Sequence, residues 1–206
     1  MKRTFVFFLT VGIIIFMVSC KQEKPVNTIE NLKAAYNGES TASAKYAKFA
    51  EKAKEEGYDT LAIMFEATSK AEAIHAENHK KVLEKLGEKV EAPTIGSFEV
   101  KTTKENLTDA INGEGYEIQT MYPDFIKVAE TETSDDAKKT FTWALDTEKK
   151  HKEFYEKALN AINAGGENTL PVKWFICPVC GNTYDETSVQ AACDFCQTKQ
   201  EKYLTF

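Results

Sequence analysis

The chain has 206 residues, of which 42% are hydrophobic and 28% are charged, and its formal net charge is -6 at pH 7. This length and composition suit one medium-sized globular domain and a smaller second one, with enough apolar residues for a hydrophobic core. The acidic balance argues against a nucleic acid as the partner, because proteins that bind the phosphate backbone usually present a basic surface.

The N-terminus has the pattern of an export signal. Two basic residues precede an apolar run over 5–18, which is too short to span a membrane comfortably. Residues 17–20, Met-Val-Ser-Cys, resemble a bacterial lipobox, and cleavage before Cys20 would leave a lipid-anchored protein of the cell envelope. A signal anchor and an ordinary cleaved signal are the alternatives. We therefore expect a signal peptide over 1–19 and a polar tether over 20–28.

The region over 29–165 is predicted to form a helical bundle. Apolar and small residues recur at helical spacing in four segments, which cover about 29–57, 60–86, 104–131 and 135–164. A long irregular stretch over 88–103 separates the second segment from the third. One long crossover with short loops elsewhere is typical of ferritin-like four-helix bundles, so we expect a mainly α fold of that class. Pro123 should kink the third helix or disturb one of its turns.

Two Glu-x-x-His motifs lie on the apolar stripes of the second and fourth predicted helices. Residues three apart on a helix share one face. Glu72 and His75 can therefore hold one metal ion, and so can Glu148 and His151. His79 lies one turn after His75, and we expect it at the surface or beside the ligands, because the motif already has its histidine.

Three further glutamates, from the first and third helices, also face the predicted core. They are Glu39, Glu114 and Glu117. A buried carboxylate is costly unless it is paired or bound to metal. A Glu from each of two helices and Glu-x-x-His from each of the others is the ligand set of ferritin-like di-iron proteins, and this chain has one carboxylate more. Mixed carboxylate and imidazole ligation suits iron or manganese. We therefore predict a dinuclear metal site, for which iron and manganese both fit.

Four cysteines near the C-terminus form two Cys-x-x-Cys pairs. They are Cys177, Cys180, Cys193 and Cys196. Each pair can place two thiolates on one metal ion, which gives tetrahedral sulfur ligation. Iron and zinc both fit, and in an exported protein two disulfides are a further alternative. After a linker over 166–171, we expect a small metal-binding domain over 172–206 that depends on its metal and its aromatic residues for stability.

Beyond these spacings, the residues resemble the rubrerythrin family over nearly all of the chain after the signal. The matching stretches are Gly-Glu-Ser at 38–40, Glu-Ala-Ile-His at 72–75, Gly-Glu-Gly-Tyr-Glu at 113–117, Met-Tyr-Pro at 121–123, Glu-Lys-Lys-His at 148–151 and Cys-Pro-x-Cys-Gly at 177–181. The resemblance implies a di-iron bundle joined to a rubredoxin-like domain whose four cysteines hold a third iron. Two positions depart from the family pattern: Asn182 replaces the usual aromatic residue, and Gln197 replaces a small one.

The resemblance also implies an activity. Members reduce hydrogen peroxide to water in oxidative stress defence, with electrons passing from the rubredoxin-type iron to the di-iron pair. Glu117 and His75 would exchange as ligands when the redox state changes, and Tyr46 and Tyr122 would support the ligating carboxylates. A homodimer is implied, in which the cysteine domain of one subunit approaches the di-iron site of the other.

Other interpretations fit the same residues. One is an iron-binding or ferroxidase protein with a structural zinc module. Another is a disulfide-bonded envelope protein with an empty bundle. For an exported peroxidase the electron donor is unidentified, because such a protein cannot draw directly on cytosolic NADH.

Overall fold

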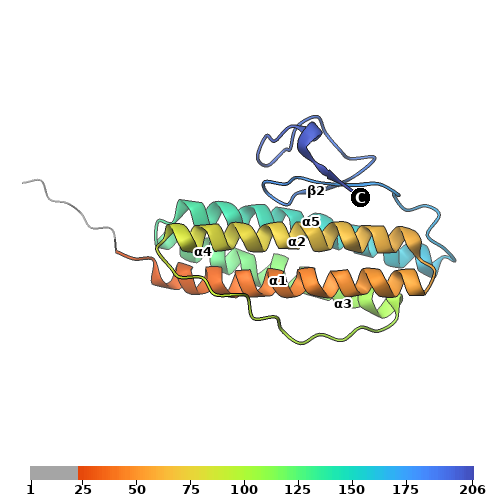
Figure 1. Cartoon of the computed structure of the whole chain (residues 1–206), viewed down its shortest axis with the longest axis horizontal. Coiled ribbons are helices and arrows are strands. Elements are labelled where there is room, and N and C mark those ends of the chain that lie inside the picture. The colour runs from red at the N-terminus through yellow and green to blue at the C-terminus, as the bar shows by residue number, and fades with distance from the viewer. Residues whose placement is uncertain (1–22) are drawn as a thin grey trace, which may run out of the picture.

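The computed structural model describes residues 23–206. The predicted signal over 1–19, the lipobox and Cys20 lie outside the described residues. Long helices lie side by side, and a small domain with β-strands packs on one side of them (Figure 1). Within residues 23–206 no helix is both long enough and apolar enough to cross a membrane.

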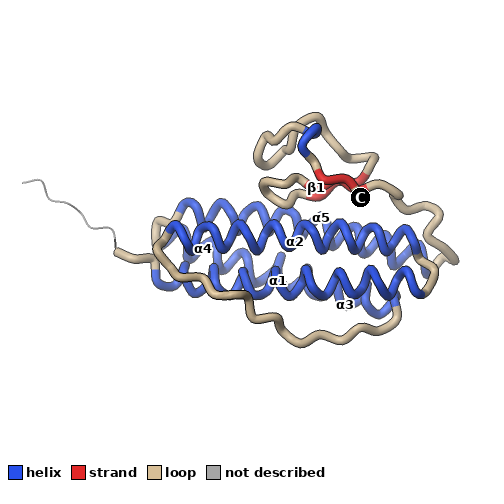
Figure 2. Tube along the Cα trace, viewed as in Figure 1, coloured by secondary structure: helices blue, strands red, loops and turns tan. Residues whose placement is uncertain are grey.

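The predicted ferritin-like bundle with one long crossover is confirmed. Its helical elements are α1 (Val26–Glu55), α2 (Asp59–Lys85), α3 (Thr103–Tyr116), η1 (Glu117–Met121), α4 (Tyr122–Thr131) and α5 (Asp135–Asn163). The elements α3, η1 and α4 follow one another as a single helical segment, so the bundle has four positions. Short turns join α1 to α2 and α4 to α5, whereas residues 86–102 cross the bundle without regular structure (Figure 2).

The first helix begins earlier than the sequence predicts. Because α1 starts at Val26, the last three residues of the predicted tether are helical. The carboxylate of Glu132 accepts hydrogen bonds from the backbone N–H of Asn27 at 3.1 Å and of Thr28 at 2.7 Å. N–H groups of a first helical turn have no partner within their own helix and favour a negative charge. Here the acceptor is about a hundred residues away in sequence, so no local signal could place the helix start.

The third helical segment has one wide turn, which confirms the predicted disturbance at Pro123. The turn is the π-helix η1, in which the N–H of Tyr122 bonds to the carbonyl of Glu117, five residues earlier. Proline has no N–H, and its ring crowds the carbonyl four residues before it, so a regular α turn is disfavoured there. The first residue of this wide turn is Glu117.

The C-terminal domain, residues 172–206, contains a three-stranded antiparallel sheet. Its strands are β1 (Trp174–Ile176), β2 (Thr183–Asp185) and β3 (Leu204–Thr205), in the order β2-β1-β3, with a 3-10 helix η2 (Gln200–Lys202) before β3. We call it the cysteine domain. The carboxylate of Glu167, in the connection to this domain, accepts the N–H of Thr60 at 3.2 Å and of Leu61 at 3.1 Å at the start of α2.

The cysteine domain packs on α2 and α5 of its own chain (Figure 1). Trp174 lies edge-on to Phe154 of α5, with ring centroids 4.7 Å apart. Asn78 of α2 donates a hydrogen bond of 2.9 Å to the carbonyl of Val179. The resemblance implies that the cysteine domain approaches the di-iron site of another subunit. In this structure the domain lies instead beside the site of its own chain. The connection fixed by Glu167 holds the domain against its own bundle.

Candidate metal centres

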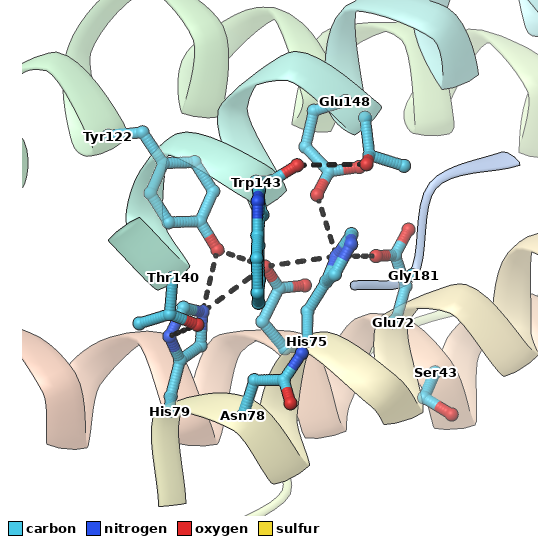
Figure 3. A network of polar contacts seen from close by, with 12 residues as sticks. Ser43, Glu72, His75, Asn78, His79, Tyr122, Thr140, Trp143, Glu148 and Gly181 are labelled. Carbon is cyan, nitrogen blue, oxygen red and sulfur yellow. Dashed lines mark hydrogen bonds and ion pairs between the residues drawn. The ribbon is translucent and has the colours of Figure 1, made fainter. Parts of the chain in front are cut away.

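Buried carboxylates and imidazoles from α1, α2, α3 and α5 meet in the middle of the bundle. Their ligand atoms form two groups, within each of which all atoms lie within 4.8 Å of one another. The groups are Glu39, Glu72, His75 and Glu148, and Glu72, Glu114, Glu148 and His151. Glu72 and Glu148 belong to both groups, as expected for carboxylates that bridge two metal ions. Figure 3 shows Glu72, His75 and Glu148 pointing toward one another between α2 and α5.

The two imidazoles take equivalent places beside the shared carboxylates. Nδ1 of His75 lies 3.0 Å from Oε2 of Glu72 and 3.0 Å from Oε1 of Glu148. Nδ1 of His151 lies 3.0 Å from Oε1 of Glu72 and 2.8 Å from Oε2 of Glu148. Each imidazole therefore faces one oxygen of each bridging carboxylate. The symmetry follows from the same three-residue spacing on two helices that face each other.

The donor set fits two metal cations. Buried polar atoms are rarely left without a partner, yet Oε2 of Glu39, both carboxylate oxygens of Glu148 and Nδ1 of His151 make no hydrogen bond among the described residues. Burial, together with the neighbouring carboxylates, raises the pKa of Glu39 and Glu114 well above the usual value. A cation in each group would satisfy the unpaired atoms and offset the carboxylate charge, and oxygen with imidazole nitrogen is a ligand set that iron accepts.

The pKa values of the paired groups indicate the same need for positive charge. Burial alone would raise the pKa of Glu72, but His151 and His75 outweigh it and hold that pKa at about 2. Burial alone would lower the pKa of both histidines. The charges of Glu148 and Glu72 outweigh it, giving a pKa of about 10 for His75 and about 9 for His151. Positive charge is therefore strongly favoured beside both bridging carboxylates.

Two tyrosines hold the carboxylates that belong to only one group. The hydroxyl of Tyr46 donates to Oε1 of Glu114, and the hydroxyl of Tyr122 donates to Oε1 of Glu39. All four residues are buried. This is the position that the sequence analysis predicts for both tyrosines, because each fixes the orientation of a predicted ligand.

His79 is buried, so its predicted surface position is wrong and the alternative position beside the ligands is the observed one. Its Nε2 lies 3.3 Å from the hydroxyl of Tyr122, and its Nδ1 lies 3.2 Å from Oγ1 of Thr140 (Figure 3). Burial, followed by the neighbouring charge of His75, lowers the pKa of His79 to about 3. A neutral imidazole can donate to Tyr122 and accept from Thr140. The spacing contained this signal, because residues four and seven apart on a helix share a face.

Glu117 is the predicted ligand that lies outside both groups. It is partly exposed and, together with Tyr46, lines a surface hollow between α1, the crossover and α3. Burial, and then the charges of Glu148 and Glu72, raise the pKa of Glu117 well above the usual value. The structure thus brings six predicted bundle ligands together and leaves the seventh beside them.

The four cysteines form a second centre. All four sulfurs belong to one group of ligand atoms within 4.8 Å, with 3.4 Å between Sγ of Cys177 and Cys196 and 3.5 Å between Sγ of Cys180 and Cys193. A disulfide bond is about 2.05 Å long, so the disulfide alternative is wrong for these four residues, which are free thiols. A tetrahedron with metal–sulfur bonds of about 2.3 Å has edges of about 3.8 Å. The four sulfurs therefore fit one tetrahedral metal ion.

Asn182, one of the departures from the family pattern, lies buried beside this centre. Its Nδ2 donates to Sγ of Cys193 at 3.6 Å and to Oδ1 of Asp194 at 2.5 Å. Its Oδ1 accepts a hydrogen bond of 2.8 Å from Nζ of Lys150. That ammonium group also lies over the Tyr184 ring, 4.5 Å from its centroid. Lys150 directly precedes the ligand His151, but no motif in the sequence indicates its contact with this centre.

The cysteine domain contacts both ligand imidazoles of the bundle. Thr183 donates its hydroxyl hydrogen to the carbonyl of Gly181 at 3.2 Å, so its Oγ1 can accept the Nε2–H of His151 at 2.8 Å. That bond leaves Nδ1 of His151 free to face a metal ion. A Cβ atom on Gly181 would lie 2.4 Å from Nε2 of His75. Gly181 is also at a φ of +81°, a conformation that favours glycine.

Comparisons with known proteins agree with this geometry. The family model for rubrerythrin matches residues 30–159. Nigerythrin of Nitratidesulfovibrio vulgaris (strain Hildenborough) is 35% identical over 92% of each chain, and Rubrerythrin-2 of Clostridium acetobutylicum is 33% identical over 89% of this chain and 98% of that one.

Solved structures extend the comparison. The structure of nigerythrin in its fully reduced, all-ferrous state superposes with a TM-score of 0.78 and 36% identity, covering 87% of this chain and 86% of that one. A bacterioferritin of Desulfovibrio desulfuricans shares the fold alone, with a TM-score of 0.66 and 21% identity. The bundle contains the Glu and His residues of a di-iron site, and a cluster of four cysteines follows it in the sequence. The chain belongs to the rubrerythrin family.

Proposed function

We propose that the protein is a peroxidase that reduces hydrogen peroxide to water at the dinuclear site, with electrons from iron in the four-cysteine centre. The observation that carries this proposal is the contact between the two centres within one chain. Thr183 bonds to His151, and Gly181 lies against His75, so only two residues separate the ligand Cys180 from a residue bonded to a bundle ligand. A structural zinc module would not require such contacts.

Reduction of one hydrogen peroxide to two waters consumes two electrons and two protons. The carboxylates and imidazoles of the two groups would hold two irons, which would supply the electron pair when bound. Protons must come from the chain or from solvent. The raised pKa of Glu117 and its place at an opening suit it to hold a proton near neutral pH and deliver it to the departing oxygen.

We further propose that Glu117 and His75 exchange as ligands. In this structure His75 belongs to a ligand group and Glu117 does not. Glu117 begins the wide turn η1, and such turns often occur at functional sites. The arrangement therefore corresponds to the form with His75 as ligand, and Glu117 is the residue that would replace it.

The remaining proposals concern location and assembly. We propose a homodimer lipid-anchored through Cys20 in the cell envelope, supplied by an electron donor that can reach the cysteine domain. The lipobox-like residues 17–20 support the anchor. Cys20→Ala should shift the protein from the membrane fraction to the soluble fraction of its host cell.

The activity is tested on one anaerobic preparation by measuring metal content, visible absorption and peroxide turnover together. We expect iron in both centres and a coloured four-cysteine centre that bleaches on reduction and recovers when peroxide is added. Glu117→Ala should slow turnover while the bundle stays folded. Zinc in the four-cysteine centre, or a bleached centre that peroxide cannot reoxidise, would overturn the proposal and favour iron binding or ferroxidase action.

A further inference from the structure

The dinuclear site is closed at both ends along the bundle axis by packed aromatic rings. On one side the rings of Phe65 and Tyr155 lie 5.4 Å apart, and on the other side those of Phe125 and Phe141 lie 5.5 Å apart. Phe65 precedes Glu72 on α2 by two turns, whereas the ring of Phe141 lies 5.3 Å from that of His79, one turn after His75. Among residues 23–206, we therefore expect access to the site through the lateral faces of the bundle.

One lateral face is closed by the cysteine domain. A Cβ atom on Gly181 would overlap His75, and Thr183 is bonded to His151. The domain covers α2 and α5, which carry both ligand histidines (Figure 1). Because Gly181 lies against His75 and the side chain of Thr183 bonds to His151, the cysteine domain blocks this face to a substrate.

The opposite lateral face contains a hollow of about 320 Å³ between α1, the crossover and α3. In Figure 1 the crossover runs along the side of the bundle away from the cysteine domain. Small residues line the hollow, namely Gly38, Ala42 and Gly113, together with the site residues Tyr46 and Glu117. A Cβ atom on Gly38 would meet no atom within 4 Å, so the space beside it is open.

The crossover forms an outer edge of this hollow and is held there by two hydrogen bonds to α1. The N–H of Thr94 donates to Oδ1 of Asn37 at 2.9 Å, and the N–H of Gly96 donates to Oγ1 of Thr41 at 2.9 Å. Thr94, Gly96, Asn37 and Thr41 all line the hollow. The long crossover thus narrows the opening to Glu117 in addition to connecting the helices.

We propose that this hollow, which we call the entry hollow, is the path by which a small neutral hydroperoxide reaches the metal pair. Glu117 and the crossover residues Thr94 and Gly96 line it, so the crossover limits the size of molecule that can reach Glu117. Oxidant and electrons then enter from opposite faces of the bundle. The proposal rests on the peroxidase function, and its test separates the two.

The first test fills the entry hollow. Gly38→Leu adds a side chain where a Cβ meets open space, so the helix should tolerate it. Ala47→Leu is the matched control, because Ala47 is exposed on the same helix and does not line the hollow. For Gly38→Leu we expect about a tenfold slower reoxidation of the reduced protein by hydrogen peroxide, since steric exclusion usually costs one to two orders of magnitude. Iron content and melting temperature should match the control.

A binding measurement gives a readout that does not depend on turnover. Titration of the oxidised protein with azide should show slower azide binding to the bundle irons in Gly38→Leu than in Ala47→Leu. If azide and peroxide react with both variants at equal rates, the entry hollow is not the path. If the wild-type protein binds azide through the hollow but never turns over peroxide, the proposed function fails and the path stands.

The second test loosens the crossover. Thr41→Val removes the acceptor for the N–H of Gly96 and keeps the side-chain volume similar. We expect the reaction with tert-butyl hydroperoxide to become severalfold faster relative to hydrogen peroxide. An unchanged ratio in this variant, with Gly38→Leu still slow, would remove the crossover from the proposal. An unchanged ratio in Thr41→Val, together with an unchanged reoxidation rate in Gly38→Leu, would overturn it entirely.

Discussion

At the scale of single residues, Asn182 departs from the family pattern, and we expect it to affect the reduction potential of the four-cysteine centre. Its amide donates to Sγ of Cys193, and a hydrogen bond to a ligand sulfur stabilises the extra negative charge of the reduced centre. Asn182→Leu should therefore lower the reduction potential of the four-cysteine iron, measured by a spectroelectrochemical titration of the visible absorption. A potential equal to that of the wild-type protein would contradict this role.

Gly181 provides a second residue-scale prediction with a close control. Gly181 and Gly87 have φ values of +81° and +82°, so alanine is strained by a similar amount at either position, roughly 1–2 kcal/mol. Only at Gly181 would the new Cβ meet His75, at 2.4 Å from Nε2, whereas Gly87 has open space. We expect Gly181→Ala to displace the cysteine domain and Gly87→Ala to leave it in place.

Limited proteolysis measures that displacement, because a displaced domain would loosen the connection over 164–173 from the contacts of Glu167 with the start of α2. The rate at which peroxide reoxidises the four-cysteine iron should also fall in Gly181→Ala and not in Gly87→Ala. Equal cleavage and equal reoxidation in the two variants would show that the contact with His75 is unimportant.

The residues that sequence could predict are those whose spacing is local. Glu72 with His75, and Glu148 with His151, share a helix face by a three-residue spacing, and the structure brings them together. The bond of Lys150 to Asn182 was not predictable, because it joins segments 32 residues apart whose relative placement depends on domain packing.

At the scale of elements, the wide turn η1 positions Glu117. Pro123→Ala restores an N–H and removes the ring that disfavours an α turn, so a regular helix becomes accessible through this segment. We expect the melting temperature to change little, because Pro123 lies in the first turn of α4, where proline is tolerated. Peroxide turnover should nevertheless fall, since the Glu117 carboxylate would be redirected.

That combination distinguishes positioning from simple destabilisation. Pro123→Ala should keep its iron content and gain helical circular dichroism while reacting more slowly with peroxide. A variant that loses activity and melting temperature together would instead indicate a general packing role for Pro123. The proline itself was visible in the sequence, but whether it would produce a kink or a π turn depends on the packing of α3 and α4 against α5.

At the scale of the whole molecule, the sequence predicts the order of the domains but not their contact. Helical periodicity and the long crossover are sufficient for the bundle, and paired Cys-x-x-Cys motifs are sufficient for a metal-binding domain. The seating of the cysteine domain on α2 and α5 results from the Glu167 contacts and the packing of Trp174 on Phe154. These are tertiary contacts with no periodic signature.

The charge of the bundle site makes the stability of the whole protein depend on metal and pH together. Burial raises the pKa of Glu39, Glu114 and Glu117 above the ordinary 4.5, so the metal-free folded protein holds more protons than the unfolded chain. Its stability should therefore fall as pH rises above about 4.5. The raised pKa of His75 and His151 acts in the same direction, because their contribution is complete below 6.5 and is lost as pH rises through about 9 to 10.

Metal ions replace those protons, and they bind more tightly as the ligands lose protons. We therefore expect the rise in melting temperature on adding ferrous iron to the metal-free protein to be larger at pH 8 than at pH 5.5, measured anaerobically by calorimetry. Glu114→Gln should flatten the pH dependence of the metal-free protein, whereas Glu130→Gln, at an exposed position, should not. An equal rise in melting temperature at both pH values would contradict this expectation. It would mean that other groups of the protein already balance the charge of the buried carboxylates, and that the bundle does not need its metals for that balance.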